Sequence, residues 1–129
     1  MTTADRAVRI LVVEDCPATA DHLHDVLAAR GFDVQVARDA SAGFIQAIWF
    51  RPAIVLVALT LAGPVGQRLP CLLRRLPTED VPLIIAATGP DGPTARLAAR
   101  VAGFDHFLPK PFDLDRLADL LEDQPPLMA

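Results

Sequence analysis

The sequence predicts an α/β domain built as a doubly wound (βα)₅ sheet, with five parallel strands and helices on both faces. Short apolar runs alternate with longer helical patterns, which is typical of strands that alternate with helices. The run Ile54–Ala58 is apolar at every position, as a strand covered on both faces requires. The length of 129 residues suits one domain with a single core, without an internal linker.

The first third of the chain predicts two strands around one helix. The first strand is expected over Val8–Val13. Pro17 then suits the first position of a helix, and Gly31 suits its left-handed end. A short second strand is expected over Val34–Ala37. The inward face of the helix is expected to carry Ala20, Leu23 and Leu27.

The second helix, expected from about Ala40 to Phe50, is unusual because no charged residue lies between Asp39 and Arg51. A helix that is apolar around most of its circumference usually has both sides covered. One helix on a sheet buries only one stripe, so some of its large apolar side chains should stay outside. Such surface marks interfaces, and tryptophan is enriched among binding hot spots. The candidate interface is Ile45, Trp49 and Phe50; the alternative is that this helix only fills the core.

The second half of the chain continues the alternation. Pro70 interrupts the third helical pattern, so that helix is expected to start near Pro70 or to kink there. The core is expected over about residues 9–122 and a frayed tail over 123–129. The other elements are expected over Ile54–Ala58, Leu83–Ala87, Thr94–Ala102, His106–Leu108 and Asp113–Glu122.

Composition and charge limit the classes of partner. The formal net charge is −4 and no basic run occurs, so nucleic acid is not an expected partner. No apolar stretch reaches the ~18 residues of a membrane helix, and the first residues lack a signal-peptide pattern. Cys16 and Cys71 have no CxxC spacing, so we expect free thiols in a reducing cytoplasm.

Polar residues follow several of the predicted strands. Glu14 and Asp15 end the first strand, and Thr88 and Lys110 follow the fourth and fifth. In doubly wound sheets functional groups gather beyond the carboxyl ends of the strands. A pair of carboxylates there suits Mg²⁺, whereas a lysine and a hydroxyl suit a phosphoryl group. The third strand ends instead in Ala58, which brings only a methyl group to this spot.

These motifs resemble the response-regulator receiver domain over about residues 9–122. Ile10–Asp15 resembles the acidic-pair strand of that family, and Ala86–Gly89 resembles its hydroxyl-bearing strand. Ala102–Phe112 resembles its switch-and-lysine segment almost residue for residue. The resemblance implies the flavodoxin-like fold and a place in bacterial two-component-type signalling.

The resemblance also implies a role for each matching residue. Asp15 corresponds to the metal-binding acid, with Glu14 as its outer partner. Thr88 corresponds to the hydroxyl that contacts the phosphoryl group, and Lys110 to the lysine that pairs with it. Phe107 occupies the position of the aromatic switch residue. Without a phosphoryl group, these residues have simpler structural alternatives: capping of the first helix, an ion pair with Lys110, and a fixed core aromatic.

The departures from the family pattern concern its reaction. The phosphoacceptor aspartate falls on Ala58, and a methyl group can neither accept a phosphoryl group nor ligate Mg²⁺. Val65 stands where an acid is common, and no Asp or Glu occurs over positions 40–77. We therefore expect no catalytic residue, no cofactor, and at most a weak Mg²⁺ site at Glu14 and Asp15.

The sequence therefore favours a stand-alone degenerate receiver, a non-enzymatic interaction module that acts without phosphorylation. Its expected partner is a sensor kinase, another signalling protein or a second copy of the chain. Two alternatives remain open: phosphorylation at an unconventional acceptor, and binding of a small anion through Lys110 and Thr88. The thiol of Cys16 lies beside two carboxylates, so we do not expect it to be an activated thiolate.

Overall fold

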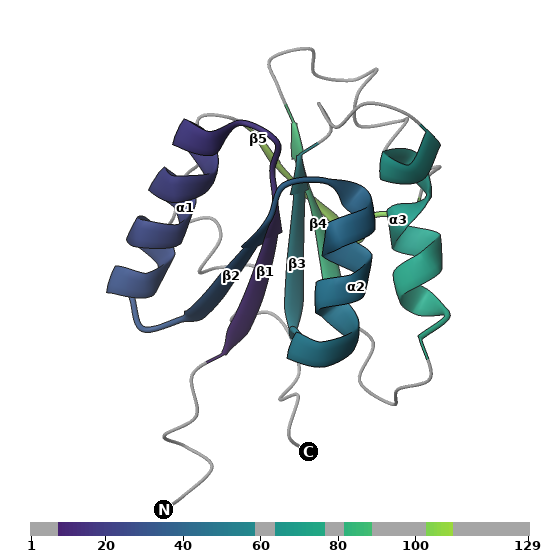
Figure 1. Cartoon of the computed structure of the whole chain (residues 1–129), viewed down its shortest axis with the longest axis horizontal. Coiled ribbons are helices and arrows are strands. Elements are labelled where there is room, and N and C mark those ends of the chain that lie inside the picture. Colours follow the sequence, from purple (N-terminus) through teal and green to yellow (C-terminus); the bar gives the residue numbers. More distant parts are fainter. Residues whose placement is uncertain (1–7, 59–63, 77–81, 89–102, 110–129) are drawn as a thin grey trace, which may run out of the picture.

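The computed structural model describes residues 8–58, 64–76, 82–88 and 103–109 of the chain. Five parallel strands form one sheet in the order β2-β1-β3-β4-β5 (Figure 1). This order confirms the predicted doubly wound fold. The strands are β1 (Arg9–Val13), β2 (Asp33–Ala37), β3 (Ile54–Ala58), β4 (Leu83–Thr88) and β5 (His106–Pro109).

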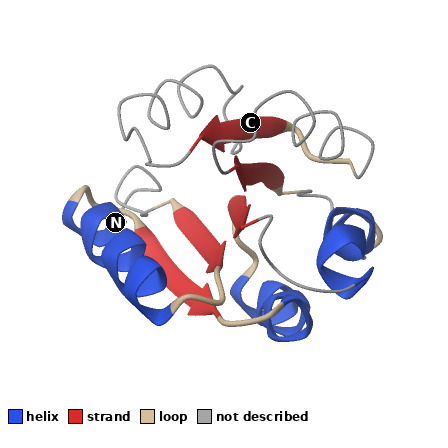
Figure 2. Cartoon of the chain, turned by 90° about the horizontal axis from the view of Figure 1, so that it is seen from above, coloured by secondary structure: helices blue, strands red, loops and turns tan. Residues whose placement is uncertain are grey.

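Three described helices cover the two faces of this sheet. Helix α1 lies across the sheet from α2 and α3 (Figure 2). Leu23 and Leu27 of α1 pack in one apolar cluster, whereas Ala47 of α2 and Leu73 of α3 pack in the other. The helices are α1 (Pro17–Ala29), α2 (Ala40–Phe50) and α3 (Pro64–Arg74).

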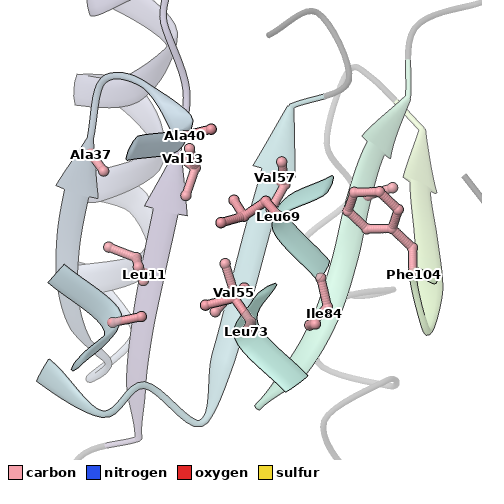
Figure 3. Close-up of a cluster of buried hydrophobic side chains, with 12 residues drawn as sticks. Leu11, Val13, Ala37, Ala40, Val55, Val57, Leu69, Leu73, Ile84 and Phe104 are labelled. Atoms are coloured by element: carbon pink, nitrogen blue, oxygen red, sulfur yellow. The ribbon is translucent and has the colours of Figure 1, made fainter. Parts of the chain in front are cut away.

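The core alternates along each strand, because successive side chains of a strand point to opposite faces. Leu11 and Val13 of β1 lie in the α2/α3 cluster (Figure 3). Ile10 and Val12 of the same strand lie in the α1 cluster. Each of these four side chains is at most 1% exposed, so β1 is buried on both faces.

Of the two alternatives for α3, a start near Pro70 is wrong, since the helix begins at Pro64 and contains Pro70 in its interior. A kink at Pro70 stays a prediction. A proline there removes one helical hydrogen bond, and the sequence therefore predicts a weak helix. Leu69 and Leu73 are both fully buried against the sheet. Burial of this apolar stripe outweighs the poor local propensity, as is common for helices in folded proteins.

The other element bounds agree with the prediction to within one residue. Strand β1 begins one residue later than expected, β2 begins one earlier, and β4 and β5 each end one later. Pro17 is the first residue of α1, as predicted. The helices expected over Thr94–Ala102 and Asp113–Glu122, and the tail over 123–129, lie outside the described residues.

Several contacts fix α2 against the sheet. At its start, Asp39 Oδ1 accepts a hydrogen bond of 2.7 Å from the backbone N–H of Ala42. At its end, Arg51 adopts a left-handed conformation with φ 52°, and its carbonyl oxygen accepts a 3.0 Å bond from Arg9 Nε. Between them, the Gln46 side chain donates to the Gln35 side chain of β2 at 3.3 Å. The bonds at Gln46 and Arg51 therefore tie the helix to β2 and β1, whereas the Asp39 cap stabilises its first turn.

The close approach of α2 to β1 depends on Gly43. A Cβ atom at this position would lie 2.9 Å from Val13 Cγ2, which real contacts do not tolerate.

Gly43→Ala is therefore expected to lower the free energy of unfolding by about 1 kcal/mol. Overpacking costs about 1–3 kcal/mol, and the better helix propensity of alanine offsets about 1 kcal/mol. Urea unfolding measures the change, with Ser41→Ala as the exposed control on the same helix; a more stable Gly43→Ala would contradict the steric argument.

Candidate functional site

The strand register places the predicted site residues at one edge of the sheet. Val13 pairs with Val57, so Glu14 follows β1 beside the end of β3. Ala58 pairs with Ala87, and Thr88 pairs with Pro109. The backbones of Glu14, Ala58 and Thr88 therefore lie at neighbouring strand ends. Lys110, the next residue after Pro109, lies outside the described residues.

Glu14 is the buried acid of this edge, with only 2% of its surface exposed. Its backbone N–H donates to the Ala37 carbonyl oxygen at 3.0 Å, which extends the pairing of β1 with β2 by one residue. Its Oε2 accepts a bond of 3.2 Å from the backbone N–H of Cys16, the N-cap residue of α1. The carboxylate is thus engaged at the start of a helix, where negative charge is favoured. This contact agrees with the structural alternative for Glu14 as a helix-capping acid.

Asp15 is the exposed acid of the same connection. Mg²⁺ in proteins takes oxygen ligands in near-octahedral geometry, usually from one or two carboxylates besides water and phosphate. The donors at this edge fit that demand poorly, because Glu14 is engaged with Cys16 and Ala58 has no side-chain oxygen. Asp15 alone remains as an exposed carboxylate among the described residues at the ends of β1 and β3. In the described ranges, no three His, Cys, Asp or Glu side chains cluster as metal ligands would.

Cys16 lies between Glu14 and the first turn of α1, and both affect its thiol. Hydrogen bonding from the Thr19 side chain, and then from the backbone of Thr19, lowers the pKa of the exposed Cys16 thiol below its ordinary value. Glu14 acts in the opposite direction, but its charge contributes less. The donors in the first turn of α1 therefore outweigh the charge of Glu14 in setting the direction of this shift. That Cys16 is not an activated thiolate stays a prediction. Cys71 is also free, as predicted, and it is exposed.

A polar network that the sequence analysis missed holds the start of β5. Asp105 Oδ2 accepts a 2.8 Å bond from the backbone N–H of Ile84 in β4, while its own N–H donates to the Ile84 carbonyl at 2.8 Å. Arg74 Nη2 of α3 donates to Asp105 Oδ1 and to the Gly103 carbonyl, each at 2.8 Å. This network sets the register of the strand that carries Phe107. An isolated Arg and Asp 31 positions apart give no signal in a single sequence.

The outward face of α2 exposes large apolar side chains. Trp49 is 83% exposed, Ile45 is 57% exposed and Ile48 is 43% exposed. Phe50 of the candidate interface is instead partly buried and packs against the α2/α3 core cluster. Ile48 was missed, although its spacing of three from Ile45 is the signal that places both on one helical face. We call Ile45, Ile48 and Trp49 the α2 stripe.

A doubly wound parallel sheet with an acidic pair after β1 and a hydroxyl residue at the end of β4 is the arrangement that the receiver class of signalling domains shares. The family model for the response regulator receiver domain matches residues 10–122. The chain therefore belongs to the response regulator receiver family.

Along the described ranges, no helix is long and apolar enough to cross a membrane.

Two kinds of relative agree with this assignment. The chain is 33% identical over 110 residues to the response regulator MprA of Mycolicibacterium vanbaalenii, covering 85% of this chain and 47% of that protein. It thus spans about half the length of the curated relatives it matches. A receiver domain structure from Bermanella marisrubri is 33% identical with a TM-score of 0.76, and covers 92% of this chain and 98% of that one. A receiver domain from Methylobacillus flagellatus is 26% identical with a TM-score of 0.78, and covers 91% and 98%.

Proposed function

We propose that this receiver domain is a degenerate one, which acts in two-component-type signalling as a protein-interaction module without being phosphorylated. The observation that carries the proposal is Ala58 at the end of β3, beside the strand ends that lead to Glu14 and Thr88. By the family resemblance, this position is that of the phosphoacceptor aspartate. A receiver switches between states only through a ligand that binds one state more tightly. Without its acceptor, the phosphoryl group cannot be that ligand.

The surroundings of Ala58 support the same proposal. The buried Glu14 carboxylate already accepts the Cys16 N–H, so it can serve the fold without any metal ion. Asp15 is left as the exposed acid, which supports at most weak Mg²⁺ binding. We therefore propose a module that needs no cofactor and is not an enzyme.

The partner in this proposal is a protein. The α2 stripe supplies an exposed apolar surface, and such surfaces mark protein interfaces. The net charge of −4 disfavours direct binding to nucleic acid. A sensor kinase or another signalling protein of the cytoplasm fits this surface, and the two free, exposed cysteines suit a reducing compartment.

Intact mass and thermal unfolding in the presence of Mg²⁺ and acetyl phosphate test the proposal. The parent chain is expected to gain no phosphoryl mass and to show no Mg²⁺-dependent rise in Tm, because Ala58 offers no acceptor oxygen. Ala58→Asp is the matched positive control. A Mg²⁺-dependent gain of one phosphoryl group on the parent would contradict the proposal and indicate an unconventional acceptor. Stabilisation by inorganic phosphate alone, lost in Lys110→Ala, would instead support the anion-binding alternative.

A further inference from the structure

We draw no further inference here: the strongest candidate, the α2 stripe of Ile45, Ile48 and Trp49 on the outward face of α2, carries nothing beyond the proposed function, because nothing in the described part of the structure shows what covers it.

Discussion

Replacing Ala58 by aspartate is expected to convert a chain that takes no phosphoryl group into one that takes one per molecule. The substitution supplies the missing carboxylate oxygen at the end of β3, beside the strand ends that carry Glu14 and Thr88. It also adds a negative charge near two acids, which destabilises the fold until a cation binds. Ala58→Asp should therefore have a lower Tm than the parent without Mg²⁺ and recover it with Mg²⁺. At a Mg²⁺ concentration about 100 times Kd, the recovery amounts to about 2.7 kcal/mol.

Ala58→Asn is the control for this gain, because it matches the size of aspartate without the charge. It should show neither the Mg²⁺-dependent rise in Tm nor the phosphoryl mass after treatment with acetyl phosphate. If Ala58→Asp also stays unmodified while it binds Mg²⁺, the loss of function extends beyond Ala58 to the rest of the pocket. That result would contradict the prediction that one residue separates this chain from a phosphorylated receiver.

Removing the Asp105 carboxylate is expected to be the more damaging change to the fold. Asp105→Ala leaves the Ile84 N–H without its 2.8 Å acceptor and removes the ion pair with Arg74. A hydrogen bond to a charged group contributes about 1.5–3 kcal/mol, and a partly exposed ion pair adds well under 1 kcal/mol. We expect a loss of about 2 kcal/mol in the free energy of unfolding, measured by urea denaturation.

Asp105→Asn separates the two contributions. Its amide oxygen can still accept the Ile84 N–H, whereas its neutral side chain no longer pairs with the Arg74 guanidinium. Asparagine should therefore cost less than half as much as alanine. Equal losses for the two variants would assign the effect to charge, and a harmless Asp105→Ala would show that the network does not hold β5.

The fold was predictable because its pattern is local and redundant. A strand that is buried on both faces, such as β3, is apolar at every position, and this can be seen without any partner. The order of the strands was not predicted, because doubly wound sheets occur in more than one order, and it comes from the structure. The position of the site followed from the same pattern, since polar residues after strands collect at one edge.

The features that could not be predicted depend on contacts between distant residues or on competing local effects. Pro70 lowers the local helix propensity of α3. The helix nevertheless begins at Pro64, because Leu69 and Leu73 are buried against the sheet, and this burial could not be predicted from the sequence. The pKa of Cys16 depends on whether carboxylates or first-turn donors contribute more, and residue identity does not decide between them. Which apolar residues of α2 face outward also depends on how the helix rotates against β1, which Gly43 sets.

The attachments of α2 to the sheet have a consequence for binding thermodynamics. The Arg9–Arg51 bond, the Gln46–Gln35 bond and the close contact at Gly43 hold the helix in one position before any partner arrives. Association through this helix therefore orders only a few side chains, at about 0.5–1.5 kcal/mol each, and no backbone. The α2 stripe is in this sense a preorganised ligand, and even a small surface can bind measurably when so little entropy is lost.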